Sequence, residues 1–401
     1  MKLRIYISTL SFVLAFCLFG CSKKKESPLQ FDELIAKEAL QFASKQYEGM
    51  IATIPDAKLP RTTHKDGKLG LVNAPDWTSG FYPGTLWYLY EFNQNETFKT
   101  EAIKYTNLLE NQKNNASTHD LGFMLYCSYG NGLRITNDSI YNQVLLTGAK
   151  TFSSRFNKKI GCIKSWDWNP KWQFPVIVDN MMNLEYLFWA SKATKDSTFY
   201  KQAISHADVT LKNHFREDNS SVHMIDYDTI TGNIIEKITV QGFSDESAWA
   251  RGQARGLYGY TMMYRETLDL KYVAQANKIA AFIFNHPNMP ADLVPYWDFN
   301  ADNIPNVPRD TSAAAIIASA LLELSQYVGN NLEEEYFEKA ATILGSLSSP
   351  AYRAELGENN NFILKHATGH LPGDKEIDVP LIYADYYYIE ALTRYLTFFN
   401  S

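Results

Sequence analysis

The sequence predicts an all-helical fold, an (α/α)6 barrel in which six helical hairpins form a closed ring. Apolar residues recur at helical spacing in twelve segments, which group into six consecutive pairs. About half of the segments, such as residues 313–322, are apolar on nearly every face, whereas several partners, such as residues 333–347, are amphipathic. A helix that is apolar all round is buried and one with a polar face is peripheral, so the pairs predict alternating inner and outer helices. An open α-solenoid, which lacks a central cavity, is the alternative.

Turn signals such as Asn95, Asp196 and Pro287 separate the predicted helices. No fixed sequence period accompanies the pairs, which argues against tandem repeats with a consensus. Residues 221–239 are the exception to the helical pattern, because two alternating stretches flank Thr231-Gly232-Asn233 and predict a β-hairpin. The twelve helices are expected at residues 31–54, 79–92, 97–113, 119–130, 138–155, 176–193, 197–215, 245–266, 269–285, 310–327, 332–347 and 380–399.

The first 21 residues have the composition of a bacterial export signal. Lys2 and Arg4 precede an apolar stretch from Ile5 to Phe19, which is too short for a membrane span. The sequence Leu18-Phe19-Gly20-Cys21 resembles a lipobox, so Cys21 is the expected lipid anchor of a lipoprotein in the periplasm or outer membrane; an ordinary cleaved signal or an anchor is the alternative. Residues 22–29 would be a tether and residues 30–401 a single domain, which contacts the membrane only through the lipid.

The composition limits which partners and cofactors are expected. Removing Lys2 and Arg4 changes the formal net charge from −6 to −8, and no basic stripe is present, so nucleic acid is not an expected partner. Cys127 and Cys162 lack metal-ligand spacing, and no metal or cofactor is expected. The many aromatic residues, 8 Trp, 25 Tyr and 23 Phe, suit carbohydrate recognition, although rings are also ordinary core material.

Three predicted inner helices begin with side chains that could perform chemistry. Asp179 starts an otherwise apolar helix, and His119 and Asp120 start another. Each carboxylate could instead be a simple helix N-cap. The third helix begins with a tract from Gln241 to Arg251, in which the arginine could bind a uronate or form a buried pair with an aspartate. Consecutive inner helices of a ring begin at the same mouth, so these groups are expected to converge there.

These stretches resemble the unsaturated glucuronyl hydrolases, glycoside hydrolase family 88, along essentially the whole mature chain. The resemblance implies an (α/α)6 barrel and release of a Δ4,5-unsaturated uronic acid from oligosaccharides, with those of glycosaminoglycan type as the expected substrates. It implies that Asp179 is the general acid/base and Asp120 its partner carboxylate. The implied substrate contacts are His119, His223, Gln241, Trp249 and Arg251, with Trp77 as a stacking wall. The motifs that carry the resemblance are Trp77-Thr-Ser-Gly-Phe, His119-Asp-Leu-Gly-Phe-Met, Val178-Asp-Asn-Met-Met-Asn-Leu, His223, Gln241-Gly-Phe-Ser-Asp-Glu-Ser-Ala-Trp-Ala-Arg-Gly-Gln-Ala, Pro295-Tyr-Trp-Asp-Phe and Asp378-Val-Pro-Leu-Ile-Tyr-Ala-Asp-Tyr-Tyr.

The implied reaction sets two expectations. The acid must keep its proton near neutral pH, and burial or a nearby like charge would hold it on Asp179. Arg255 departs from the family pattern, since many members have an aromatic residue there, near the leaving sugar. We therefore expect Arg255 to contact sulfate or carboxylate on that sugar. The unsaturated rhamnogalacturonyl hydrolases and a non-catalytic glycan-binding lipoprotein are the alternatives; the former usually carry Gly-Arg-Gly-Asn where this chain has Ala250-Arg-Gly-Gln.

Overall fold

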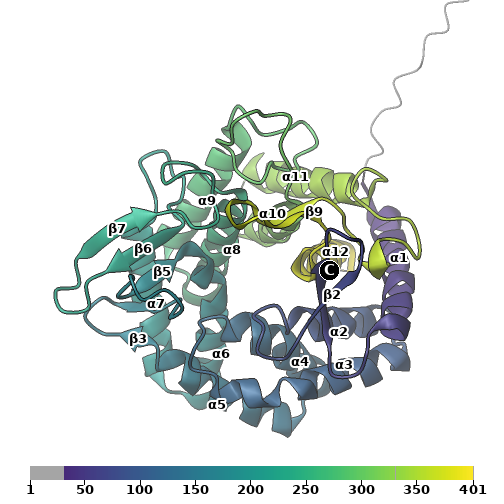
Figure 1. The fold of residues 1–401 in the computed structure, drawn as a ribbon, viewed down its shortest axis with the longest axis horizontal. Helices are drawn as coiled ribbons and strands as arrows, with labels where there is room; N and C mark the ends of the chain where they lie inside the picture. Colours follow the sequence, from purple (N-terminus) through teal and green to yellow (C-terminus); the bar gives the residue numbers. More distant parts are fainter. Residues whose placement is uncertain (1–30, 330, 401) are drawn as a thin grey trace, which may run out of the picture. The chain divides into compact units, whose positions relative to one another are not determined.

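In the described part of the chain, six helical hairpins with two arms each form a closed ring, as the apolar pattern predicts. The structure, a computed structural model, describes residues 31–329 and 331–400, and within them each of the twelve predicted segments contains a helix. Figure 1 looks down this ring and shows one set of helices around its centre and a second set outside. The outer helices are α1 (Glu33–Thr53), α3 (Glu96–Leu108), α5 (Ser139–Ser153), α7 (Ser197–Asn213), α9 (Leu270–Asn285) and α11 (Asn331–Ser348).

The inner arms are less regular than the outer ones. Two of them begin with non-α turns, a π-helix η2 (Gly122–Gly130) that runs into α4 (Asn131–Thr136) and a 3-10 helix η3 (Val178–Asn183) that runs into α6 (Leu184–Thr194). The other inner helices are α2 (Phe81–Asn93), α8 (Ala250–Thr267), α10 (Thr311–Leu324) and α12 (Ile382–Asn400). Shorter 3-10 turns are η1 (Glu110–Asn114), η4 (Ser325–Tyr327), η5 (Asn359–Asn361) and η6 (Leu371–Gly373).

Burial follows the inner and outer assignment. Every residue of α10 is buried, whereas α11 buries only the face that includes Tyr336, Ala340 and Leu344. Most outer helices begin at an Asp or Asn whose side chain accepts a backbone N–H of the first turn, as Asp32 and Asp138 do. Local capping signals therefore mark most outer helix starts, whereas burial on every face distinguishes an inner helix such as α10.

Packing between the first and last helices closes the ring. α12 packs against α2 and α1, and Tyr47 of α1 donates its hydroxyl to Asp385 of α12 at 3.2 Å. Asp385 also accepts the backbone N–H groups of Ile363 and Leu364, each at 2.9 Å. The described residues from Phe31 onward cluster as one compact unit. In the described part of the chain, no helix is long and apolar enough to cross a membrane.

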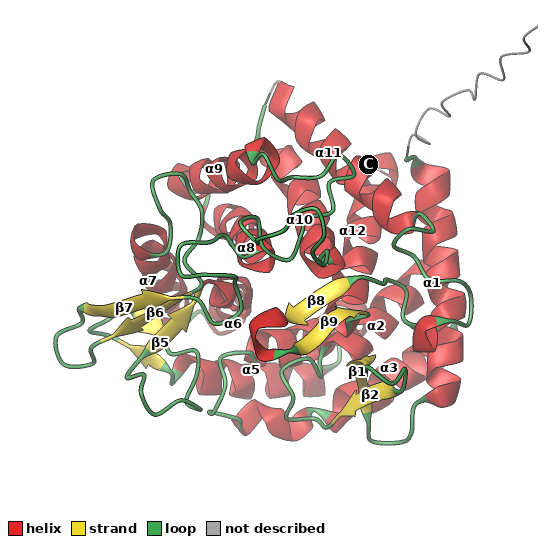
Figure 2. Cartoon of the chain, turned by 45° about the horizontal axis from the view of Figure 1, so that its top comes forward, coloured by secondary structure: helices red, strands yellow, loops and turns green. Residues whose placement is uncertain are grey.

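Among the residues that the structure describes, four small antiparallel sheets lie in the loops between the helices (Figure 2). The predicted hairpin is confirmed as β6 (Met224–Tyr227) and β7 (Ile234–Ile238), which pair from Met224 opposite Ile238. The other strands are β1 (Leu59–Thr63) with β2 (Leu69–Val72), β3 (Phe156–Asn157) with β4 (Cys162–Ile163), β5 (Pro175–Ile177) beside β6, and β8 (Ala367–His370) with β9 (Lys375–Val379).

Two predicted helix starts are wrong in position. The helix expected from residue 176 begins only at Leu184, because Pro175–Ile177 pairs with β6 as a strand. The helix expected from residue 245 begins at Ala250, and Ser244 and Ser247 instead form a turn that precedes it. In both places a β-strand or turn occupies the residues that would have extended the helix toward the mouth of the ring.

Candidate active site

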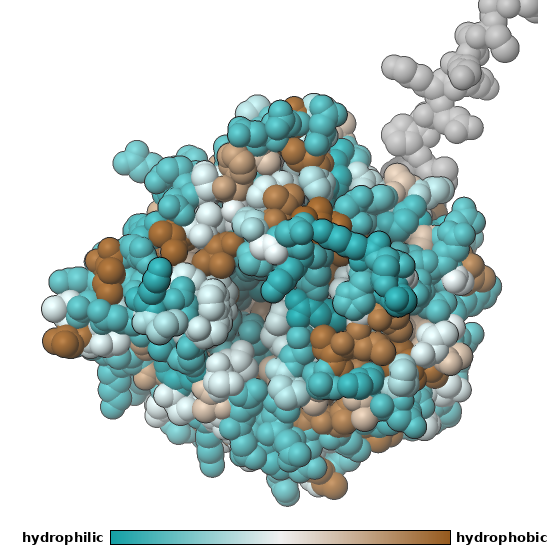
Figure 3. Space-filling view, viewed as in Figure 1, coloured by the Kyte–Doolittle hydropathy of each residue, from teal (hydrophilic) through white to brown (hydrophobic). Residues whose placement is uncertain are grey.

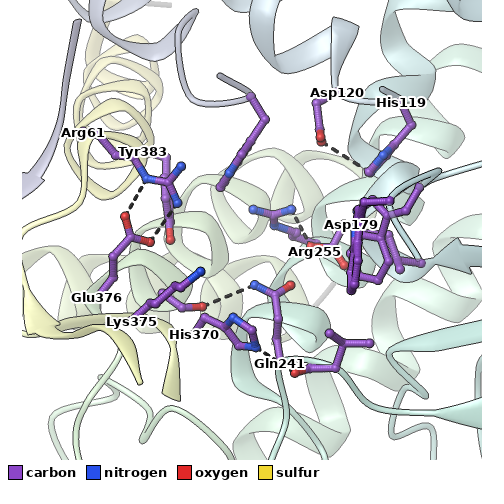
Figure 4. A pocket seen from close by; sticks show the side chains of 16 residues that line it. Arg61, His119, Asp120, Asp179, Gln241, Arg255, His370, Lys375, Glu376 and Tyr383 are labelled. Carbon is purple, nitrogen blue, oxygen red and sulfur yellow. Dashed lines mark hydrogen bonds and ion pairs between the residues drawn. The ribbon is translucent and has the colours of Figure 1, made fainter. Parts of the chain in front are cut away.

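A cavity of about 260 Å³ lies at the end of the ring where the inner helices begin. Figure 3 shows the hollow near the centre of this face, and Figure 4 shows the side chains inside it. Six of the residues that the sequence singles out line the cavity: Trp77, His119, Asp120, Asp179, Gln241 and Arg255. The other lining residues are Arg61, Trp166, Trp168, Ile177, Val240, Gly369, His370, Lys375, Glu376 and Tyr383. Side chains from the starts of several inner arms therefore meet in one place.

Asp179 lies in the 3-10 turn between β5 and α6, and its side chain is 2% exposed. Neighbouring Val178 and Met181 belong to the buried apolar set, so the surroundings are as apolar as the sequence predicts. Its Oδ1 accepts from Arg255, and its Oδ2 has no hydrogen-bond partner in the described part of the chain, so neither oxygen caps the turn. The interpretation of Asp179 as a helix N-cap is therefore wrong.

The partner of Asp179 is Arg255, from the second turn of α8. Arg255 Nη1 lies 2.5 Å from Asp179 Oδ1, and the arginine side chain is only 5% exposed (Figure 4). The guanidinium also lies 5.4 Å from the ring centre of Trp77 and 5.0 Å from that of Phe123, which is cation–π distance. Arg255 thus contacts the candidate acid directly, a partner different from the sugar substituent expected for it.

This ion pair reverses the expected protonation of Asp179. Burial acts to raise the pKa of the carboxyl group, but the charge of Arg255, with a smaller contribution from Arg251, holds that pKa below its usual value. The expectation that burial keeps the proton on Asp179 is therefore wrong for the structure as described. A carboxylate with this environment can accept a proton but holds none to donate at neutral pH.

Asp120 lies on the adjacent arm, just before η2, and its side chain is 13% exposed. One carboxylate oxygen accepts the Thr118 hydroxyl at 3.0 Å, and the other lies 3.3 Å from His119 Nε2. His119 Nδ1 lies 2.8 Å from the carbonyl oxygen of Ser165, which requires a proton on Nδ1. Burial lowers the pKa of His119, so Nε2 of the neutral ring faces Asp120 without a proton.

His223 lies behind Asp179 and fixes the turn that carries Gln241. Its Nδ1 accepts the backbone N–H groups of Val240 and Gln241 at 2.9 and 3.2 Å. Burial lowers the pKa of His223 to about 4, so the neutral ring carries its proton on Nε2, which lies 3.7 Å from Asp179 Oδ2. The Gln241 side chain reaches across the cavity and donates to the carbonyl of Gly369 at 3.3 Å.

Trp249 and Arg251 lie behind the cavity wall. Arg251 Nη1 is 2.6 Å from Asp310 Oδ2, in a pair whose members are 1% and 0% exposed. Its other hydrogen bonds go to the carbonyls of Thr368 and Gly369 in β8, and its guanidinium lies 4.4 Å from the ring centre of Trp249. The sequence allowed Arg251 either to bind a uronate or to form a buried pair with an aspartate, and the structure shows the buried pair. The hydrogen bonds of Arg251 to Thr368 and Gly369 link α8 to β8. Contact of either residue with a substrate stays a prediction.

Two hairpins supply lining residues that sequence reasoning missed. Arg61 of β1 binds Glu376 of β9 through two hydrogen bonds, at 2.5 and 3.0 Å, and binds Asp76 at 2.8 Å. The dipeptide Asp66-Gly67 is a strong hairpin signal that could have revealed β1 and β2. A Pro-Gly pair at residues 372 and 373 likewise marks the turn of the β8–β9 hairpin.

A second, larger cavity of about 410 Å³ contains none of the predicted site residues. Tyrosines such as Tyr88, Tyr258 and Tyr386 line it, together with Glu390 and Arg394. Cys127 also lines this second cavity; both Cys127 and Cys162 are buried free thiols. The cavity with Asp179 and Asp120 is therefore the candidate active site.

No protein-family model matches this chain. Similar individual proteins are named unsaturated glucuronyl hydrolase or unsaturated chondroitin disaccharide hydrolase. An unsaturated glucuronyl hydrolase of Formosa agariphila is 48% identical over 84% of this chain and 82% of its own length. An unsaturated chondroitin disaccharide hydrolase of Streptococcus agalactiae is 33% identical over 81% of this chain and 82% of its own length.

Solved structures agree with these relatives. An unsaturated glucuronyl hydrolase described as specific for heparin is 50% identical and superposes with a TM-score of 0.90, over 92% of this chain and 99% of its own. The Streptococcus agalactiae unsaturated glucuronyl hydrolase is 30% identical, with a TM-score of 0.86, over 92% of this chain and 96% of its own. Likeness of this extent covers both the ring and the loops that form its cavity. By sequence and by fold, the chain belongs to the unsaturated glucuronyl hydrolases.

Proposed function

We propose that the protein removes the Δ4,5-unsaturated uronic acid from the non-reducing end of glycosaminoglycan-type oligosaccharides produced by polysaccharide lyases. The observation that carries this proposal is the placement of Asp179 and Asp120 on one cavity, beside the ring of Trp77. A sugar face can stack on such a ring while the carboxylates reach the reacting carbons. The relatives named above support the same class of reaction.

The chemistry explains why the site needs a carboxyl group that both gives and takes a proton. The substrate has a C4=C5 double bond conjugated to the ring oxygen, so protonation at C4 leaves positive charge at C5. Water adds at C5 as the acid, now a base, removes its proton. The resulting hemiketal opens and releases the next sugar. In this scheme Asp179 is the acid and base, and Asp120 holds the substrate and the water beside it.

Heparin-type disaccharides are the proposed first substrates. A protein 50% identical to this chain over 99% of its length is described as specific for heparin. A variant of the Streptococcus agalactiae protein has been solved with dGlcA-GalNAc6S, which makes chondroitin-type disaccharides the second choice. The cavity wall opposite Asp179 carries Arg61, His370 and Lys375, cationic or polar groups that suit an anionic sugar (Figure 4).

Loss of the ultraviolet absorbance of the C4=C5 bond tests this proposal. The purified protein is mixed with unsaturated heparin, chondroitin, hyaluronan and pectin disaccharides, with Asp179→Asn as the control. We expect rapid loss with at least one glycosaminoglycan disaccharide and a rate at least about 100-fold lower in the variant. Activity on the pectin fragment alone would favour the rhamnogalacturonyl alternative, and full activity of Asp179→Asn would remove Asp179 from its role.

We also propose that Cys21 carries a lipid that anchors the enzyme at the periplasmic side of a membrane or at the outer membrane. Cys21 and the signal segment lie outside the described residues, so the support is the lipobox-like sequence alone. Expression with radiolabelled palmitate in a bacterial host tests it. We expect label in the wild-type chain and none in Cys21→Ser, which should leave the membrane fraction. Equal labelling of both chains would contradict the proposal.

A further inference from the structure

Arg255 and Asp179 form a closed ion pair inside the very cavity that must admit an anionic sugar. Both side chains line the cavity although each is at most 5% exposed, so a ligand on the cavity floor touches both. Within the described part of the chain, Asp179 Oδ2 and Arg255 Nε have no hydrogen-bond partner. Each member of the pair thus has unused capacity toward a ligand.

The groups around Asp179 favour its ionised form. Arg255 and Arg251 approach it from α8, His223 from the segment before β6, and His119 from the segment before η2. Burial lowers the pKa of His223 to about 4 and also lowers that of His119, so both rings are neutral at neutral pH. The positive charge that matters is therefore that of the arginines, and only Arg255 touches the carboxylate.

We propose that Arg255 is a positioning residue that couples substrate binding to proton uptake, exchanging the carboxylate of Asp179 for the carboxylate of the substrate. This inference rests on the proposed function. In the free enzyme the guanidinium pairs with Asp179. In the complex it pairs with the uronate, and Asp179 takes one proton from solvent. The net charge of the site is the same before and after, because one carboxylate replaces another and the proton neutralises the first.

The surroundings of Arg255 suit such an exchange. A guanidinium is always charged and forms two parallel hydrogen bonds with a carboxylate, which favours a uronate over a neutral sugar. Trp77 and Phe123 lie beside its planar face and support it whichever carboxylate it binds. Once the counter-charge is taken up by the substrate, the desolvation of Asp179 favours its protonated form. The acid is then created only where a substrate is present.

Other cations in the cavity are worse placed for this role. Arg61 is held by Glu376 and Asp76 together. Lys375 lies across the cavity from Asp179, as Figure 4 shows. If the uronate bound Lys375 instead, Arg255 would keep Asp179 ionised and substrate binding would take up no proton.

The dependence of the kinetic constants on pH tests the exchange. Above the pKa of free Asp179, kcat/KM of the wild-type enzyme should fall about tenfold per pH unit from about pH 5 to 7, whereas kcat stays level over the same range. The value of KM should therefore rise with pH. In Arg255→Gln the acid no longer has its counter-charge, so kcat/KM should be level at the acidic end of this range. Arg255→Lys should restore the slope.

Arg61→Gln is the matched control, because it removes a cavity cation that does not touch Asp179. Its pH slope should equal that of the wild type, whatever its KM. A level kcat/KM in the wild type, or an unchanged slope in Arg255→Gln, would overturn the inference while leaving the hydrolase activity in place. Absence of hydrolysis with every substrate would instead overturn the proposed function.

Calorimetry gives a second measurement that depends on no variant. A disaccharide whose uronate is saturated has no C4=C5 bond to react, so it is titrated into the wild-type enzyme at neutral pH in two buffers of different ionisation enthalpy. The difference in binding enthalpy should correspond to uptake of about one proton per disaccharide. Binding without proton uptake would overturn the coupling.

Discussion

Asp179 shows how a buried carboxylate depends on one partner. The carboxylate and Arg255 are each nearly inaccessible to solvent, and their pair is the direct contact that offsets the burial of both charges. Removing one member of such a pair leaves the other buried and uncompensated, which is strongly destabilising. Arg255, however, cannot give up its charge, whereas Asp179 can take up a proton. The two halves of the pair should therefore respond differently to substitution.

Asp179→Asn should abolish turnover and also destabilise the fold. We expect the free energy of unfolding to fall by about 3 kcal/mol, because Arg255 stays charged and loses its partner. Urea denaturation measures this change. Substrate affinity, measured by calorimetry, should increase, since no internal carboxylate competes for the guanidinium.

Asp120→Asn is the comparison for that prediction. Its carboxylate is bound by a threonine hydroxyl and faces a histidine, with no arginine in contact. Turnover should fall as well, but the free energy of unfolding should change by only about 1 kcal/mol. Equal destabilisation by the two substitutions would show that the Arg255 pair does not stabilise the folded state.

Among the secondary-structure elements, the β1–β2 and β8–β9 hairpins are far apart in the chain but contact each other at the mouth of the cavity. Arg61 of β1 links Glu376 of β9 to Asp76, which precedes α2. Thr62 of β1 also donates its hydroxyl to the carbonyl of Pro380 at 2.8 Å. The hairpins therefore hold one wall of the cavity, including His370 and Lys375, at a set distance from the inner helices.

Arg61→Ala should loosen this wall without touching the catalytic pair. We expect KM to rise several-fold, roughly equivalent to 1 kcal/mol of binding, with a smaller change in kcat. Hydrogen exchange measures the loosening, which should appear as faster exchange of amides in residues 367–379. Unchanged exchange in that stretch would contradict the role given to Arg61.

At the scale of the whole molecule, the ring is stable only if its first and last helices meet. Asp385 of α12 makes that contact by accepting Tyr47 from α1 and two backbone N–H groups from residues 363 and 364. These three donors are buried and would lose their acceptor together. Asp385 belongs to a motif that resembles the family, yet the structure places it in ring closure and outside the cavity.

Asp385→Ala should lower the free energy of unfolding by about 3 to 5 kcal/mol, because three buried donors are left unsatisfied. Thermal denaturation checks the change as a lower melting temperature. Tyr47→Phe is the matched control, since it removes only the hydroxyl donor and should cost about 1 kcal/mol. Equal losses in the two variants would mean that the backbone bonds to Asp385 contribute nothing.

The twelve helices, their inner and outer alternation, the β6–β7 hairpin and the family could all be predicted from the amino-acid sequence. Apolar period and turn residues act over a few neighbours, so they can be read without knowing what packs against them. The same local patterns predicted helices at the cavity that were too long at their starts. The residues before α6 form β5 instead, because they pair with β6, about fifty residues away. The hairpins that carry Arg61 and Lys375 had turn signals but no strong alternation.

The side-chain contacts of the site residues, in contrast, could be found only from the tertiary structure. Asp179 and Arg255 are separated by 76 residues and Arg251 and Asp310 by 59, and no local pattern states that these side chains meet. An apolar neighbourhood in the sequence implies a raised pKa for Asp179, because it shows the burial but not the charge opposite. Coulomb interaction depends on distance through space, and that distance is set only when the ring closes and brings α8 against η3.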